Sequence, residues 1–341
     1  WMNKRFNITG SCVPDQHYMV DITERLEKIK EMIDRGDYFV INRGRQYGKT
    51  TTLKALNNYL ADSYYVVSMD FQRQMSTAKF KDEYSFSVAF IKAFIASLKR
   101  NECSEQLLSA INKLEEIIID NLDLVDLFVN LSEFCGSAEK PVVLMIDEVD
   151  QASNNQVFLD FLAQLRGYYL DRFDSPTFKA VILAGVYDIR NLKLKIRDDS
   201  NHKHNSPWNI AVDFNVDMSL TTNGISGMLT DYEKDHNTGM DIDDISQLIY
   251  DYTSGYPVLV SNICKLIDED IHEWTGEGII KAVNQILATN TPLFDSLINR
   301  LEEYPEMKKS LYQILTKGDR FSFNPDHEQT KLLLMFGFVK V

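Results

Sequence analysis

The apolar positions of the chain fall into two alternating patterns, short continuous runs and longer stretches with helical spacing. Four runs are apolar along most of their length, namely Asp37–Asn42, Tyr64–Asp70, the run that opens Lys140–Ala152, and Phe178–Val186. Continuous apolar runs of this length are typical of strands that are buried on both faces of a parallel sheet.

Between these runs the apolar residues recur every three or four positions, which predicts helices. Ile22, Leu26, Ile29 and Ile33 form one such stripe, which Gly36 is expected to end. Further helices are expected from about Lys49 to Ala61, over most of 80–135, and over 158–173. Strand and helix repeat four times, so the pattern predicts an α/β fold with a parallel sheet covered by helices.

The second half of the chain is more helical. Residues 187–209 are polar and aperiodic, which predicts a mobile loop, and 210–219 are compatible with a fifth strand. Two or three helices are expected over 241–288, interrupted at Ser254–Val258. The chain ends in a strand-like apolar run, LLLMFGFVKV.

Composition and charge narrow the class of protein. The chain has 341 residues, with 36 Lys and Arg against 50 Asp and Glu, so the net charge is −14. Such a surface disfavours non-specific binding of nucleic acid, although a local basic patch is compatible with it. No run is long enough to cross a membrane, no signal peptide opens the chain, and the four cysteines are scattered. We therefore expect a cytoplasmic protein without a membrane partner.

The clearest candidate chemistry lies in FVINRGRQYGKTTTLKAL, a strand, a turn and then a helix. Gly48, Lys49 and Thr50 match the end of the phosphate-binding motif G-x-x-x-x-G-K-[ST], but Arg43 replaces its first glycine. A helix N-terminus attracts anions, Lys49 is placed to reach the β- and γ-phosphates, and Thr50 is placed to bind Mg²⁺. An ordinary strand-to-helix turn is the alternative.

A second motif follows about a hundred residues later. VVLMIDEVD is a buried run that ends in two acids, the pattern of a Walker B strand. Asp147 is the candidate ligand of Mg²⁺, and Glu148 is the candidate base that orients the attacking water. An acidic cap after a buried strand is the alternative, but the two motifs in this order favour a nucleotide site.

These motifs, together with VILAGV, resemble those of prokaryotic AAA-like ATPases of the STAND-type branch of P-loop NTPases. In that family an arginine commonly replaces the first glycine of the loop, and Arg43 and Arg45 occupy its two arginine positions, while Gly44 replaces the usual proline. The resemblance covers about residues 13–290. It implies ATP or ADP and Mg²⁺ as cofactors, and it implies that Gly255-Tyr256-Pro257 packs near the adenine.

The resemblance and the residues together give the following predicted site. The nucleotide is expected to be bound by Gly44, Arg45, Gln46, Tyr47, Gly48, Lys49, Thr50, Thr51 and Pro257. The catalytic residues are expected to be Lys49, Asp147 and Glu148, and the metal ligands Thr50 and Asp147.

The resemblance also implies an order of domains. We expect an N-terminal lead and helix at 1–36, a P-loop ATPase core at 37–230, a helical lid at 231–290 and a small domain similar to a winged helix at 291–341. The last of these has few basic residues, so a structural or switch role is favoured over DNA binding.

Several residues have two open interpretations. Arg43 or Arg45 lies near the phosphates or clamps the N-terminal segment, unless both face solvent. Asp70 lies near the attacking water or caps a helix, and Asp150 supports the metal site or caps a helix. Arg190 is a candidate sensor of the γ-phosphate or a solvated loop residue. A metal site at His202 and His204 is disfavoured, because a third ligand is missing nearby.

Three functions are compatible with this sequence. The leading hypothesis is Mg²⁺-dependent ATP binding and hydrolysis that drives a switch. The second is a nucleotide-bound scaffold with negligible turnover, whose function is to bind a protein partner. The third is an ATPase coupled to nucleic-acid processing or to defence against mobile DNA.

Overall fold

The structure, a computed structural model, describes residues 4–100, 103–118, 121–186, 208–289, 291–317 and 328–339. These residues divide into two compact units. The sheet unit consists of Leu26–Asn42 and Leu53–Val216, and the loop unit consists of Trp1–Arg25, Arg43–Thr52 and Asp217–Val341. The predicted domain limits stay a prediction.

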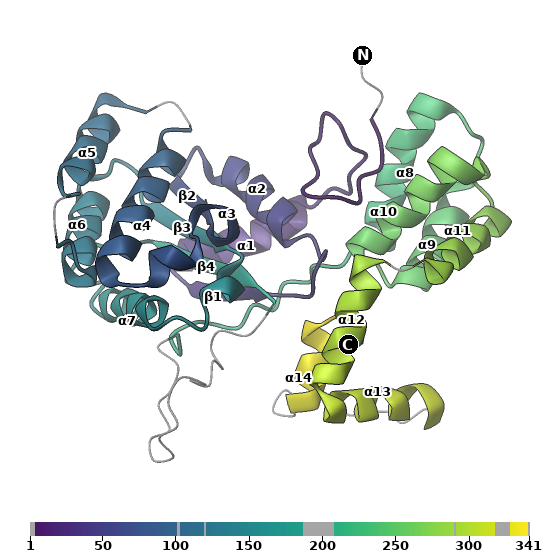
Figure 1. Cartoon of the computed structure of the whole chain (residues 1–341). Coiled ribbons are helices and arrows are strands. Elements are labelled where there is room, and N and C mark those ends of the chain that lie inside the picture. The colour runs from purple at the N-terminus through teal and green to yellow at the C-terminus, as the bar shows by residue number, and fades with distance from the viewer. Residues whose placement is uncertain are drawn as a thin grey trace. The chain divides into compact units, whose positions relative to one another are not determined.

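The sheet unit contains the parallel sheet that the sequence predicts (Figure 1). Its strands are β1 (Tyr38–Asn42), β2 (Tyr65–Asp70), β3 (Val142–Asp147) and β4 (Ala180–Gly185), in the order β1-β4-β3-β2. Asn42 pairs with Gly185, and Asp70 pairs with Asp147. The carboxyl ends of the strands therefore meet at one edge of the sheet.

Both faces of this sheet are buried, which explains why its strands are apolar along most of their length. Side chains alternate between the faces, so Val142, Leu144 and Ile146 of β3 lie in the main core, while Val143 and Met145 point to the other face. All six residues of β3 are buried, including Asp147 at its end.

Helices cover the sheet, and their limits follow local capping signals. Asp82, Ser104 and Asp123 each precede a helix and accept a backbone N–H two or three residues inside it. The helical segments are α1 (Thr23–Arg35), α2 (Lys49–Leu60), α3 (Phe71–Gln74), η1 (Thr77–Phe80), α4 (Glu83–Leu98), α5 (Glu105–Glu116), α6 (Leu124–Ser137), η2 (Val149–Gln151) and α7 (Gln156–Leu170).

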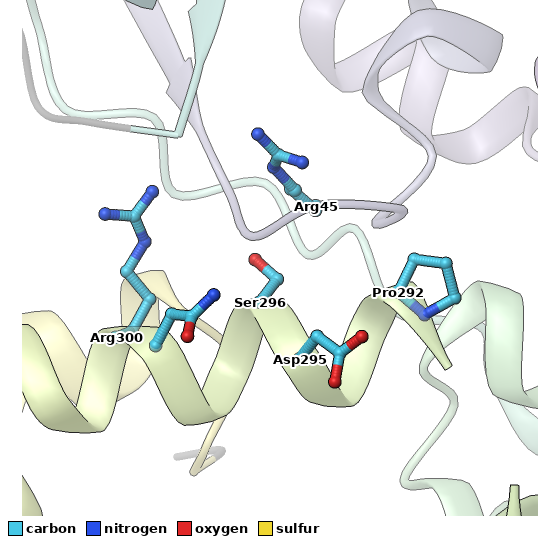
Figure 2. A pocket seen from close by; sticks show the side chains of 6 residues that line it. Arg45, Pro292, Asp295, Ser296 and Arg300 are labelled. Carbon is cyan, nitrogen blue, oxygen red and sulfur yellow. The ribbon is translucent and has the colours of Figure 1, made fainter. Parts of the chain in front are cut away.

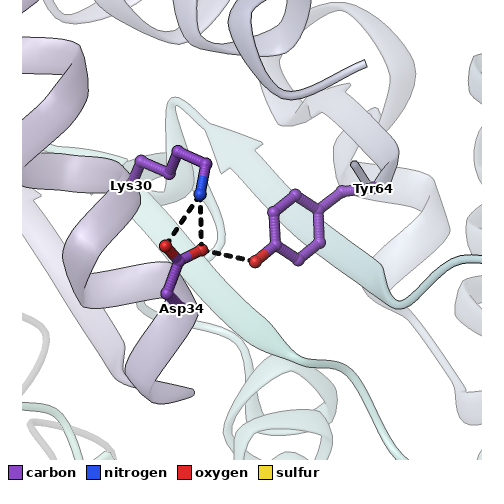
Figure 3. A network of polar contacts seen from close by, with 3 residues as sticks. All are labelled: Lys30, Asp34 and Tyr64. Carbon is purple, nitrogen blue, oxygen red and sulfur yellow. Dashed lines mark hydrogen bonds and ion pairs between the residues drawn. The ribbon is translucent and has the colours of Figure 1, made fainter. Parts of the chain in front are cut away.

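A small polar network joins the end of α1 to the residue before β2 (Figure 3). The Lys30 ammonium lies 2.7 Å from Oδ2 of Asp34, and the Tyr64 hydroxyl donates to Oδ1 of Asp34 at 2.5 Å. These hydrogen bonds hold the pKa of Asp34 below its usual value, and burial with the Asp34 contact raises the pKa of Tyr64 to about 12.

The loop unit is helical. Its segments are α8 (Thr222–His236), α9 (Ile242–Thr253), α10 (Pro257–Leu266), the π-helix η4 (Ile267–Ile271), α11 (Gly276–Ala288), α12 (Pro292–Glu303), α13 (Pro305–Lys317) and α14 (Glu328–Met335). Phe6 and Tyr18 of the N-terminal segment pack among Tyr232 and Trp274 in its core. The N-terminal segment is thus part of this helical core.

Three expectations differ from the structure. Residues 210–219 form a single bridge, Phe39 with Val212, in place of a fifth strand. Trp208, at the end of the expected mobile loop, is fully buried beside Tyr38, since an indole ring gains more from burial than the polar sequence around it suggests. The last apolar run is helical over 332–335, as part of α14.

Other expectations fall outside the described residues. These are the loop residues 187–207, with Arg190, His202 and His204. The winged-helix assignment of 291–341 stays a prediction. No helix in the described ranges is both long and apolar enough to cross a membrane.

Candidate functional site

The candidate phosphate-binding turn, Arg43–Gly48, is here called the GKT loop. It directly follows the last residue of β1, and α2 begins at Lys49. Gln46 and Gly48 have left-handed backbones, with φ of 58° and 80°. A Cβ atom on Gly48 would meet nothing nearer than Cγ of Pro257, at 3.9 Å. Gly48 is therefore required by its backbone conformation, which side chains disfavour, while the space beside it is open.

The Lys49 ammonium turns back into the GKT loop. It donates to the carbonyl oxygen of Arg43 at 2.9 Å and to that of Gly44 at 3.0 Å, and the residue is only 7% exposed. A cation in this position lies at the centre of the loop, beside the N-terminus of α2. The loop can thus combine a lysine charge with backbone N–H groups, which are the two elements of an anion site.

The three threonines after Lys49 differ in their surroundings. Thr50 is exposed in the first turn of α2. The Thr51 hydroxyl accepts the backbone N–H of Cys12 at 3.2 Å, so the N-terminal segment contacts this helix. The buried Thr52 hydroxyl lies 3.3 Å from Nη1 of Arg25, whose Nη2 donates to the carbonyl oxygen of Met218 at 3.0 Å. Of the three hydroxyls, that of Thr50 is the one placed at the surface.

The Gly-Tyr-Pro turn of the sequence lies against the GKT loop. The Tyr256 hydroxyl donates to the carbonyl oxygen of Arg45 at 2.7 Å, and the Tyr256 and Tyr47 rings meet edge to face at 4.5 Å. Pro257 is the first residue of α10, where its missing N–H costs nothing. Gly255 has a left-handed backbone, and a Cβ there would lie 2.0 Å from the carbonyl oxygen of Leu220.

The C-terminal segment also contacts the GKT loop. A Cβ atom on Gly44 would lie 2.9 Å from the carbonyl oxygen of Phe336. Gly337, with φ of 80°, packs beside Tyr256 and Tyr47, and a Cβ there would lie 2.9 Å and 3.3 Å from their rings. Gly44 and Gly337 are therefore glycines because the two chain segments approach each other closely.

The two arginines of the loop have different environments. Arg43 is half-buried, and burial lowers the pKa of its guanidinium while Tyr47 and Asp217 oppose this effect. The solvent-facing interpretation is therefore wrong for Arg43. Arg45 is exposed, and it lines an open pocket of about 330 Å³ with residues of α12 (Figure 2).

The acidic motif ends β3 in the sheet unit. Asp147 is only 6% exposed, and its Oδ1 accepts the N–H of Glu148 at 3.0 Å. Glu148 has a left-handed backbone, with φ of 56° and ψ of 40°. A non-glycine residue in this conformation carries a local energetic cost, and such residues are enriched at functional sites.

Asp70 and Asp150 have structural roles at the same sheet edge. Asp70 ends β2 and caps α3, because its carboxylate accepts the N–H of Arg73 at 3.2 Å, which confirms the helix-cap interpretation. Asp150 lies inside η2, so it is not an N-cap. Its Oδ2 accepts the N–H of Val186 at 2.6 Å, which ties the segment after β3 to the end of β4.

Sequence reasoning missed two residues around the GKT loop, Arg25 and Arg300. Tyr256 was named as part of the Gly-x-Pro signature, but its contacts with Arg45 and Tyr47 have no signal in the sequence. Arg25 and Arg300 lie in ordinary amphipathic helices, where an arginine is expected at the surface. Only contacts between distant segments reveal them.

A profile of the AAA-like domain matches residues 14–341. The chain belongs to the AAA-like domain family. A search of curated proteins found no match to this AAA-like chain.

A solved structure with a similar fold is that of a Walker-type ATPase. The Walker-type ATPase PABY2304 of Pyrococcus abyssi shares 13% identity with this AAA-like chain, at a TM-score of 0.58, covering 97% of this chain and 93% of that one. The Aeropyrum pernix ORC1 protein in complex with DNA has 13% identity and a TM-score of 0.45, covering 98% and 87%. The Aeropyrum pernix ORC2 protein in ADPNP–ADP complexes has 12% identity and a TM-score of 0.47, covering 98% and 89%. The first of these shows that the AAA-like chain has the fold of a P-loop ATPase.

Proposed function

We propose that this AAA-like protein binds ATP and Mg²⁺ at the GKT loop, hydrolyses ATP, and uses the nucleotide state as a switch. The observation that carries the proposal is the Lys49 ammonium, held inside a loop that joins a buried parallel strand to a helix N-terminus. In this proposal the backbone N–H groups of 44–51 and Lys49 bind the phosphates, and Thr50 and Asp147 hold Mg²⁺. The residues fit these ligands, because they are a hydroxyl and a carboxylate, the oxygen donors that Mg²⁺ prefers.

The sheet order supports the same assignment. β4 lies between β1 and β3, so the carboxyl ends of β1 and β3 are two strand spacings apart, about 10 Å. Asn42, the residue before the GKT loop, and Asp147 thus end two strands of the same sheet at the same edge. Bound Mg²⁺ would supply charge neutralisation for the phosphates. Glu148 would orient the attacking water and take its proton on the side-chain carboxylate.

A nucleotide-bound scaffold with negligible turnover is the second candidate, and the contacts of the loop favour it. Tyr256 and Phe336 pack against the loop, and Lys49 is bound by loop carbonyl groups. Product release often requires a loop to move, so contacts that hold the GKT loop in place favour slow release of the bound nucleotide. In either case we propose that the C-terminal helices respond to the nucleotide, as the STAND-type resemblance implies, and transmit its state to a protein partner.

The test is Mg²⁺-ATP turnover by the purified chain beside Glu148→Gln and Lys49→Ala, with the bound nucleotide of each quantified. We expect Glu148→Gln to keep nucleotide and to lose turnover by about 10²–10⁴-fold, since this is the typical contribution of a general base. Lys49→Ala is expected to lose binding. Glu133→Gln, an exposed residue of α6, is the matched surface control.

The outcomes separate the two candidates. Bound nucleotide without turnover in the wild type and in Glu148→Gln alike would favour the scaffold. Nucleotide binding by Lys49→Ala equal to the wild type would contradict the site itself. The net charge of −14 gives no support to a nucleic-acid partner, and DNA binding measured against salt concentration tests that third function.

A further inference from the structure

The pocket beside Arg45 is built largely from one face of α12. Its other lining residues are Pro292, Asp295, Ser296, Asn299 and Arg300, which recur at the three- and four-residue spacing of a helical stripe. Figure 2 shows Arg45 reaching toward the pocket from the GKT loop and Arg300 rising from α12 on the same side. The volume, about 330 Å³, is sufficient for a small ligand.

The chemistry of this lining favours an anion. The lining contains two guanidinium groups and one carboxylate, that of Asp295, while the Glu303 carboxylate that pairs with Arg300 lies outside the lining. Ser296 and Asn299 add a hydroxyl and an amide, which are neutral hydrogen-bond donors. Arginine binds phosphate through two parallel N–H groups, so a pair of arginines flanked by neutral donors suits a phosphate group better than a carboxylate-rich or apolar ligand.

Arg300 lines this pocket and also contacts the C-terminal segment. Its guanidinium forms an ion pair with Glu303, one turn further along α12, and lies 5.4 Å from the centre of the Phe336 ring. Phe336 is the residue whose carbonyl group packs against Gly44. A ligand that attracts Arg300 therefore competes with Glu303 and with the Phe336 ring for this guanidinium.

We propose that this pocket binds a phosphate group through Arg45, Arg300, Ser296 and Asn299, and that its occupancy weakens the packing of Phe336 on the GKT loop. The phosphate belongs either to the far end of a nucleotide bound at the GKT loop, in which case the site rests on the proposed function, or to a separate phosphate-bearing molecule. In both cases the ligand binds to α12 and changes the packing of the C-terminal segment.

The first experiment measures ATP, ADP and inorganic phosphate binding by calorimetry, with Ser296→Asp as the main variant. A carboxylate at this position repels phosphate without removing either arginine. Ser310→Asp, on α13 away from the pocket lining, is the matched control. We expect Ser296→Asp to weaken phosphate binding at least tenfold, since charge-assisted hydrogen bonds are each worth about 1.5–3 kcal/mol, or about tenfold or more.

Two comparisons distinguish the two possible sources of the phosphate. If it is the end of the nucleotide, Ser296→Asp weakens ATP binding but leaves ADP binding within about twofold. If it is a separate molecule, inorganic phosphate still binds to Lys49→Ala, and Ser296→Asp in that background abolishes the binding. Failure of the proposed function alone would appear as loss of ATP and ADP binding in the wild type with phosphate binding retained.

Two further variants test the role of Arg300. Glu303→Gln releases the guanidinium from its carboxylate, so we expect phosphate to bind a few-fold more tightly. Arg300→Gln is expected to weaken binding, and cleavage by a protease near 336–339 should become faster when phosphate is added to the wild type but not to this variant. Identical titrations for the wild type, Ser296→Asp, Arg300→Gln and Ser310→Asp would overturn the proposal.

Discussion

The front and the back of the GKT loop contain one glycine each, and the two are required for different reasons. Gly48, at the back, has a left-handed backbone with φ of 80° and open space beside it. Gly44, at the front, lies outside the left-handed region, but a Cβ atom there would lie 2.9 Å from the carbonyl oxygen of Phe336. The back of the loop is thus set by local backbone conformation, and the front by a segment almost three hundred residues away.

This difference explains the departure of the loop from the usual motif. The first glycine of the motif is absent, and Arg43 stands in its place, half-buried between the loop and Asp217. Gly44 does not replace that glycine in function, because it makes room for the C-terminal segment. The front of the loop is therefore a docking surface within the protein, while the back retains the features of an anion site.

The largest effect is expected from Gly48→Ala. The left-handed backbone costs an L-residue about 1–2 kcal/mol, and the added methyl group faces the space where phosphate is proposed to bind. We expect nucleotide affinity to fall by about 10–100-fold, with the unfolding free energy changed less. Titration with a fluorescent ATP analogue measures this effect. Gly167→Ala, where no atom lies within 4 Å, is the control, and equal affinities for both variants would contradict the assignment.

Gly44→Ala should act on stability more than on affinity. The new methyl group would press on the Phe336 backbone, and overpacking of this kind costs about 1–2 kcal/mol. We expect a lower unfolding temperature and faster proteolysis of the C-terminal segment, with nucleotide affinity kept within about threefold of the wild type. Loss of nucleotide binding with unchanged stability would contradict the assignment of Gly44 to the packing of the C-terminal segment.

Tyr256→Phe removes one hydrogen bond and keeps the ring contact with Tyr47. The bond to the carbonyl oxygen of Arg45 is 2.7 Å long, and its loss leaves a buried acceptor, at a cost of about 1 kcal/mol. We expect a modest loss of stability by calorimetry and a faster release of bound nucleotide. Tyr252→Phe, at an exposed position of α9, controls for the loss of a hydroxyl. Identical stability and nucleotide release for the two variants would show that the Tyr256 hydroxyl does not stabilise the GKT loop.

The smallest effect is expected in the sheet unit, at Asp34. Its folded-state pKa is lowered by Lys30 and Tyr64, so its contribution is present above the unfolded pKa of about 4 and is lost as the pH falls through the folded value. The folded-state pKa of Tyr64 is raised to about 12, so its contribution to stability is fully present below the unfolded pKa of about 10 and is lost as the pH rises through about 12.

Asp34→Asn should therefore flatten the acid side of the stability profile by a few tenths of a kcal/mol, because the carboxylate is 45% exposed and its ion pair is screened. Urea unfolding between pH 3 and 7 measures this change. A wild-type profile and an Asp34→Asn profile that run parallel across this range would contradict the pKa assignment.

Much of the fold was predictable because its signals are local. The four continuous apolar runs predict the four strands, and each is apolar because it is buried on both faces. The fifth expected strand was wrong, since 210–219 has the composition of a strand but makes only one bridge. Strand pairing depends on an available partner edge, and composition does not report that.

The candidate site was predictable to a similar extent. Gly48, Lys49, Thr50, Asp147 and Glu148 stand at fixed offsets from strand ends, so their motifs name them directly. The left-handed conformation of Glu148 and the two carbonyl contacts of Lys49 have no signature in the sequence. Their roles in nucleotide chemistry stay predictions until the variants are measured.

The sequence by itself determined the order of strands and helices, the place of the GKT loop between them, and the acids at the end of β3. Only the tertiary structure decided which segments cover the loop. Tyr256 lies 211 residues from Arg45 and Phe336 still further from Gly44, and no local pattern predicts either contact. Motifs and periodicity arise from the geometry of neighbouring residues, whereas contacts across such distances depend on how whole helices pack.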